Sequence, residues 1–80
     1  MKRTFKQIAL EVKSLWKNVY FGAAPYLDAM LSLDTTDPNA SYYFDDADTI
    51  VRYFLANAQT FKGPDARRIK AELKSMLLKF

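Results

Sequence analysis

The sequence predicts an all-α fold: a compact small bundle of three long helices and one short helix, forming a single helical domain over residues 1–80. Apolar residues recur at spacings of three and four in four separate segments, which is the period of one helical face. Turn-forming residues separate these segments, and no strand-like alternation of usable length competes with them. Because the connections are short, we expect neighbouring helices to be antiparallel.

The first helix is expected to begin after Thr4, whose hydroxyl suits an N-cap. Gly22 suits a left-handed helix stop or a turn, because glycine takes a positive φ without a steric penalty. The apolar face between these two positions consists of Phe5, Ile8, Val12, Leu15, Trp16 and Val19.

A short second helix is expected from Pro25 to about Leu33, since proline fits the first helical position, where its missing N–H costs nothing. Its apolar face is Leu27, Met30 and Leu31. The stretch DTTDPNAS, residues 34–41, follows and is rich in residues that favour local side-chain hydrogen bonds. We expect it to be the longest loop.

The third and fourth helices have the clearest periodicity. Asp45 or Asp46 is expected to cap the third, and Asp48 and Arg52 are spaced for an i,i+4 ion pair. Pro64 fits the first position of the fourth, which is expected to run almost to the C-terminus. The two apolar faces are Ala47, Ile50, Val51, Phe54, Leu55 and Ala58, and then Ala66, Ile69, Leu73, Met76, Leu77 and Phe80.

Half of the residues are hydrophobic, so a packed core is expected, although a chain of 80 residues has a thin margin of stability. There is no cysteine, which removes disulfides and suits a reducing compartment. The sequence shows neither a secretory signal nor an apolar run of membrane-spanning length. We therefore expect a cytoplasmic protein without a membrane partner.

Charge is segregated along the chain. Residues 1–17 carry a net charge of +4, residues 18–48 carry −6, and residues 49–80 carry +5. Such a layout indicates that acidic and basic segments lie against each other, that opposite patches face outward, or both.

Catalytic chemistry is not indicated. The chain has no histidine and no cysteine, and its serines lie in helical or capping contexts, so we predict a protein that is not an enzyme and needs no cofactor. The aspartates from Asp34 to Asp48 do not make a calcium loop, because Pro38 and Asn39 occupy its fifth and sixth positions and the sixth should be glycine. We interpret these aspartates as caps and turn formers, and predict no metal site.

Two sets of residues are candidate binding surfaces. On the fourth helix, Arg67, Lys70 and Lys74 form one stripe, whereas Arg68 is spaced to pair with Glu72. This stripe is equally consistent with a solvent-exposed helix face and with a surface that binds nucleic acid or an acidic protein. A generic anion site at the FKGPDARR turn, from Lys62, Arg67 and Arg68, is a weaker alternative, because the glycines of a phosphate loop are missing.

The second set is aromatic and acidic. Tyr42, Tyr43 and Phe44 stand in a row before Asp45 and Asp46. Three consecutive aromatic residues cannot all point inward from one element, and exposed tyrosine is typical of protein-binding surfaces. We predict binding through Tyr42, Tyr43, Asp45 and Asp46, while packing of two rings on the bundle end remains an alternative. With twelve aromatic residues, a homo-oligomer also stays open.

The strings VRYFLANAQTFKGPDARRIKAELKSML and PYLDAMLSL resemble a set of small uncharacterised all-helical proteins of bacteriophages and bacterial mobile elements. The recurring features correspond here to Tyr53 to Leu55, Asn57 with Ala58, Thr60 to Gly63, and Ala66 to Lys70, and the similarity covers most of the chain after Ala24. The resemblance implies an accessory protein that binds host machinery, such as an inhibitor of the anti-CRISPR kind.

We therefore expect a non-enzymatic accessory protein that binds a host protein. The competing hypothesis is a small DNA- or RNA-binding protein, which could use Lys2, Arg3, Lys6, Lys13 and Lys17 as well if the first helix lies beside the fourth.

Overall fold

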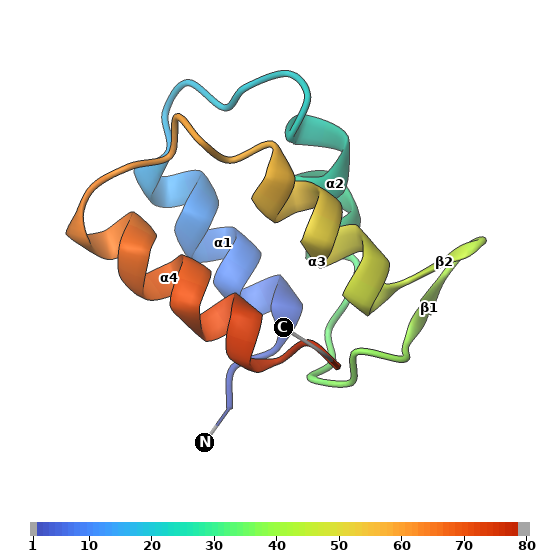
Figure 1. The fold of residues 1–80 in the computed structure, drawn as a ribbon. Coiled ribbons are helices and arrows are strands. Elements are labelled where there is room, and N and C mark those ends of the chain that lie inside the picture. Colours follow the sequence, from blue (N-terminus) through green and yellow to red (C-terminus); the bar gives the residue numbers. More distant parts are fainter. Residues whose placement is uncertain (1, 79–80) are drawn as a thin grey trace.

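The computed structural model describes residues 2–78 and shows four helices and one small antiparallel hairpin (Figure 1). The helices are α1 (Phe5–Leu15), α2 (Ala24–Leu31), α3 (Ala47–Ala56) and α4 (Pro64–Ser75), and the strands are β1 (Ser41–Tyr42) and β2 (Asp45–Asp46). The mainly helical fold is confirmed. The helices have 11, 8, 10 and 12 residues, so they do not separate into three long helices and one short one.

Helix α1 begins as expected. The Thr4 hydroxyl accepts a hydrogen bond from the backbone N–H of Gln7, and the Gln7 side chain accepts one from the N–H of Thr4, which completes a capping box. The N–H groups of Phe5 and Lys6 donate to the carbonyls of Thr35 and Leu33, so the start of α1 is tied to the loop after α2. The helix ends at Leu15, earlier than the apolar pattern indicates, because Trp16 is already extended.

Gly22 lies in the turn before α2, which is one of the two expected roles, but it does not have a left-handed conformation. Within residues 2–78, Gly63 is the only glycine at a positive φ. A Cβ at Gly22 would lie 2.6 Å from the ring of Tyr20 and 2.9 Å from Oδ1 of Asn57. Glycine is therefore required here for the close approach of two segments, and not for a left-handed stop.

The hairpin is the feature that the sequence pattern missed. Ser41 pairs with Asp46 and Tyr42 with Asp45, which leaves Tyr43 and Phe44 as a two-residue turn. Such a short ladder has no alternation long enough to recognise. Asp46 then caps α3, since its carboxylate accepts a hydrogen bond from the N–H of Thr49 at 2.8 Å.

Helix α2 packs against both α1 and α3, and α4 packs against α1. Figure 1 shows the hairpin projecting from the helices on the side away from the start of α4. At the core, the Trp16 ring stacks on Phe61 at 5.2 Å and meets the edge of Phe54 at 6.2 Å. The core thus joins the end of α1, the last turn of α3 and the turn before α4.

Helix α4 begins at Pro64 after Gly63, which has a φ of 107°. Its last turn ends at Ser75, and Met76 is still buried beyond it. Phe80, which the apolar pattern assigns to this helix, lies outside the described residues.

Candidate binding surfaces

The structure distributes the predicted site residues over three places. Tyr42, Tyr43 and Asp45 belong to the hairpin, and Asp46 lies where the hairpin joins α3. Arg68 lies on the side of α4 that meets α1. The other four residues lie at the start of α4 or along it, and these are Lys62, Arg67, Lys70 and Lys74.

The hairpin tip is strongly aromatic and exposed. The side chains of Tyr43 and Phe44 are 86% and 105% exposed, whereas Tyr42 is half-buried and packs against the core. The ring of Tyr43 stands edge-on to the ring of Tyr42 at 4.8 Å. Sequence reasoning named the two tyrosines but left Phe44 out. Phe44 is exposed because it lies in the two-residue turn at the tip of the hairpin. The hydrophobic pattern of the sequence does not indicate this turn.

Tyr43 has a backbone conformation that tyrosine rarely adopts. Its φ is 55°, and it is the only non-glycine residue at a positive φ between residues 2 and 78. In two-residue hairpin turns this position normally holds glycine, asparagine or aspartate. A left-handed conformation costs an ordinary L-residue roughly 1–2 kcal/mol, because Cβ approaches a backbone carbonyl oxygen. Glycine, asparagine or aspartate would therefore cost the fold less at this position.

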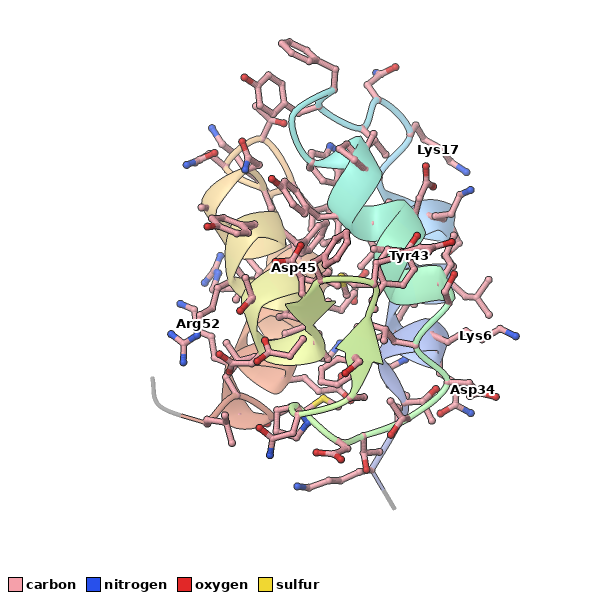
Figure 2. The ribbon with its side chains drawn as sticks, turned by 90° about the vertical axis from the view of Figure 1, so that its right-hand side faces the viewer. Lys6, Lys17, Asp34, Tyr43, Asp45 and Arg52 are labelled. Atoms are coloured by element: carbon pink, nitrogen blue, oxygen red, sulfur yellow. The ribbon has the colours of Figure 1, made fainter. Side chains whose placement is uncertain are left out.

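The two neighbouring acids differ. Asp45 is exposed, and no described residue forms an ion pair with its carboxylate. Asp46 is half-buried and uses its carboxylate to cap α3. In the view of Figure 2, Tyr43 and Asp45 lie between Lys6 on one side and Arg52 on the other. Asp45 is therefore available to a partner, and Asp46 is a structural residue.

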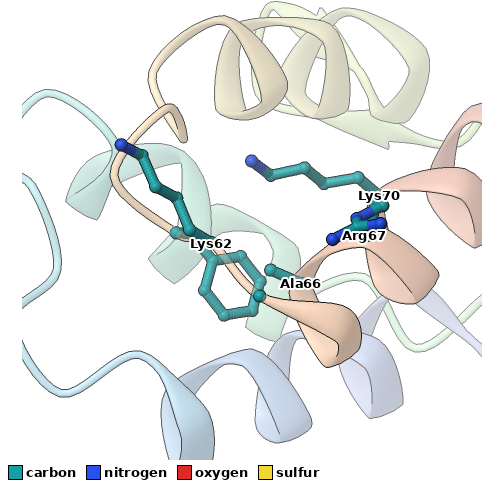
Figure 3. A pocket seen from close by; sticks show the side chains of 6 residues that line it. Lys62, Ala66, Arg67 and Lys70 are labelled. Atoms are coloured by element: carbon teal, nitrogen blue, oxygen red, sulfur yellow. The ribbon is translucent and has the colours of Figure 1, made fainter.

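The second surface is a solvent-open pocket of about 290 Å³ beside the start of α4 (Figure 3). Its lining includes the cations Lys62, Arg67 and Lys70. Lys70 is only partly exposed, because its ammonium donates to the carbonyl of Ala58 at 2.7 Å and lies 5.9 Å from the centre of the Phe61 ring. Burial, with the nearby charges of Lys74 and Lys62, lowers the pKa of Lys70.

Arg68 is not part of this pocket, and its expected pairing with Glu72 is wrong. Its guanidinium donates to Glu11 on α1 at 2.7 Å and to Asp65 at 3.3 Å, which raises the pKa of Arg68. Glu72 instead accepts two hydrogen bonds from Arg3, at 2.6 and 3.0 Å. Arg3 also donates to Glu11 at 2.8 Å. We call this group of Arg3, Glu11, Arg68 and Glu72 the α1–α4 seam.

Helix α1 does lie beside α4, as the nucleic-acid hypothesis requires, but the cations do not merge into one patch. Arg3 and Arg68 face carboxylates across the seam. Lys6 borders the face that carries the hairpin (Figure 2). Lys17 directly follows Trp16, whose ring stacks on Phe61 near the start of α4. The basic surface is divided rather than continuous.

Within residues 2–78 no group of three or more acidic side chains is arranged to hold a metal ion, and no helix is long and apolar enough to cross a membrane. Comparison with known proteins gives no match to a family model, to a curated protein or to a solved structure.

Proposed function

We propose that this chain is a non-enzymatic binding module whose hairpin tip docks on another protein. The observation that carries the proposal is the tip itself: two almost fully exposed rings, one of them on a residue held at a positive φ. Strain of this kind persists where it serves a purpose other than stability. Exposed aromatic anchors supply large contact area at a protein interface, and they cluster at its energetic centre.

The charge beside the tip indicates the kind of partner. Asp45 is exposed and follows Phe44 directly, so a partner that receives the rings also meets a carboxylate. The complementary surface is an apolar pocket with a lysine or arginine at its rim, because a matching charge guides encounter and fixes orientation. The narrower proposal that this partner is a host protein, inhibited as by an anti-CRISPR protein, rests on the resemblance to small phage proteins alone.

Site-specific photo-crosslinking in a lysate of the source cells tests the proposal. A photoreactive phenylalanine analogue replaces Phe44 in one sample and Phe21 in the other; Phe21 is a matched control, since it is 81% exposed in the turn between α1 and α2. We expect a defined adduct from position 44 that position 21 does not give. The adduct should disappear with Asp45→Lys, which reverses the charge beside the tip.

Tyr43→Gly separates binding from folding. Relief of the positive-φ strain offsets the lost contact with Tyr42 and the added freedom of glycine, so the unfolding free energy should stay within about 1 kcal/mol of wild type. Affinity for the purified crosslinked partner, measured by calorimetry, should fall at least about tenfold. Unchanged affinity, equal adducts from positions 21 and 44, or an adduct made of two copies of this chain would each contradict the proposal.

A further inference from the structure

The pocket beside the start of α4 is lined by positively charged residues. The proposed docking through the hairpin does not explain this charge. The lining residues of the pocket comprise three cations and no carboxylate, and they are Phe61, Lys62, Gly63, Ala66, Arg67 and Lys70. Lys62 comes from the turn before α4, and Arg67 and Lys70 come from its first two turns. Figure 3 shows the side chains of Lys62 and Lys70 extending on two sides of the same opening, with Arg67 beside Lys70.

This concentration of charge is unusual for the chain. In the α1–α4 seam, both arginines donate to carboxylates at 2.6–2.8 Å. At the pocket, no carboxylate among residues 2–78 forms an ion pair with Lys62 or Arg67. Like charges gathered in a concave site focus a positive potential that attracts an anion.

Lys70 is held in place before any ligand arrives. One of its three N–H groups donates to the Ala58 carbonyl, and the ammonium lies 5.9 Å from the centre of the Phe61 ring, so these contacts restrict its position. Burial and the charges of Lys74 and Lys62 disfavour its charged form. An anion in the pocket would supply the missing counter-charge, and a cation fixed in advance binds it at a smaller entropic cost.

We propose that this pocket binds the terminal phosphate group of a small ligand. A phosphate carries close to two negative charges and several strong acceptor oxygens, which matches three cations around one opening. Arginine can bind it through two parallel hydrogen bonds, and lysine binds it as a compact charge. A volume of about 290 Å³ accommodates a phosphate and a small organic group attached to it.

A nucleic-acid backbone fits this site less well. A phosphodiester carries one charge per group, and a polynucleotide needs cations repeated along a track. The positive charge does not continue as such a track toward α1, because Arg68 faces Glu11 and Asp65, and Arg3 faces Glu11 and Glu72. The pocket is therefore assigned to a terminal phosphate and not to the middle of a strand.

The test is a ¹H–¹⁵N NMR titration of the full chain at neutral pH with three probes at matched ionic strength. The probes are inorganic phosphate, ribose 5-phosphate and a single-stranded oligonucleotide without terminal phosphates, with chloride as the reference. We expect saturable shifts of the amides of residues 61–70 with the first two probes, and a Kd of about 1 mM or tighter. Tighter binding of the sugar phosphate identifies an ester as the ligand, and equal binding identifies phosphate itself.

Variants make the assignment specific. Lys62→Met with Arg67→Gln should weaken phosphate binding at least about tenfold, since charge-assisted hydrogen bonds are lost. Both side chains are exposed, so the fold should survive, and this is checked in the same spectra. Lys6→Met with Lys13→Met, an equal loss of charge at two exposed positions of α1, should leave the affinity unchanged. The proposal is overturned by shifts that chloride reproduces, by absence of saturation well above 1 mM, by undiminished binding in the first double variant, or by tighter binding of the oligonucleotide.

Discussion

The two sides of α4 use the same kinds of side chain in opposite ways. On the side facing α1, Arg68 lies against Glu11, and Glu72 receives Arg3. On the side facing the pocket, Arg67 has no carboxylate partner among residues 2–78, and Lys70 binds a backbone carbonyl. The arginines of the seam are thus paired with carboxylates, whereas within the described residues Arg67 at the pocket is not. This difference indicates that the seam stabilises the fold and that the pocket is available for a ligand.

The difference also shows how a tertiary contact displaces a local one. Arg68 and Glu72 have the spacing of a helical ion pair, which is worth a few tenths of a kcal/mol. Arg3 offers Glu72 two parallel hydrogen bonds from a position 69 residues away, and a bidentate arginine–carboxylate pair is stronger and better oriented. Once Glu72 is occupied, Arg68 turns to Glu11 and Asp65.

The largest expected effect concerns the buried face of α4. Leu73 is fully buried, and Leu73→Ala should lower the unfolding free energy by about 2–5 kcal/mol, because it removes packed methyl groups and leaves a cavity. Urea denaturation followed by circular dichroism measures the loss. In a domain of this size it removes a large part of the total stability.

Leu10→Ala is the matched control, since Leu10 is 52% exposed on α1. The same deletion there should change the unfolding free energy by about 0.5 kcal/mol or less. Equal losses from the two variants would mean that Leu73 is not buried in the core as described.

The same helices show what the sequence could and could not supply. The buried faces around Ile8, Phe54 and Ile69 follow from spacing, because the helical period places such residues together whatever the tertiary arrangement. Leu15 was expected on the apolar face but is exposed, since α1 ends at that residue and the chain turns away. The extent of a helix thus depends on its neighbours as well as on its pattern.

The binding surfaces were predictable only in part. The Asp45 and Tyr43 surface follows from an excess of adjacent aromatic residues, but the exposure of Phe44 depends on a two-residue turn that leaves no periodic signal. Lys62, Arg67 and Lys70 were named from the sequence. The inward orientation of Lys70 depends on the Ala58 carbonyl and on Phe61, which come close only because the connection between α3 and α4 folds back beside α4.

A medium effect is expected from the seam, and it depends on pH. Hydrogen bonds from Arg68 and then Arg3 lower the pKa of Glu11 below its usual value. The carboxylate therefore stabilises the fold above the unfolded-state pKa of about 4.3, and this contribution is lost as the pH falls through that value toward the folded-state pKa. At pH 7, Glu11→Gln should cost roughly 1 kcal/mol, a value reduced for solvent exposure.

Urea midpoints of wild type and Glu11→Gln between pH 7 and pH 3 measure this contribution. The difference in urea midpoint between the two proteins should be largest at neutral pH and should become smaller below about pH 4.5. Asp45→Asn serves as the control, because no described residue forms an ion pair with Asp45, and its gap to wild type should be small throughout. A gap for Glu11→Gln that does not change with pH would mean that its charge does not stabilise the seam.

The smallest effect is expected at the pocket, and the neighbours Arg67 and Arg68 offer a matched pair. Without a ligand, Arg67→Gln should change the unfolding free energy by no more than about 0.5 kcal/mol, since it breaks no ion pair with a described residue and reduces the positive charge around Lys70. Arg68→Gln makes the same charge change but removes hydrogen bonds to Glu11 and Asp65, so it should be the more destabilising. Urea denaturation at low salt and at 1 M salt measures the difference in unfolding free energy between the two variants. This difference should shrink at 1 M salt, because salt screens exposed charges. If Arg67→Gln proves the more destabilising, the pocket cation already has a structural partner and the contrast between the two sides of α4 fails.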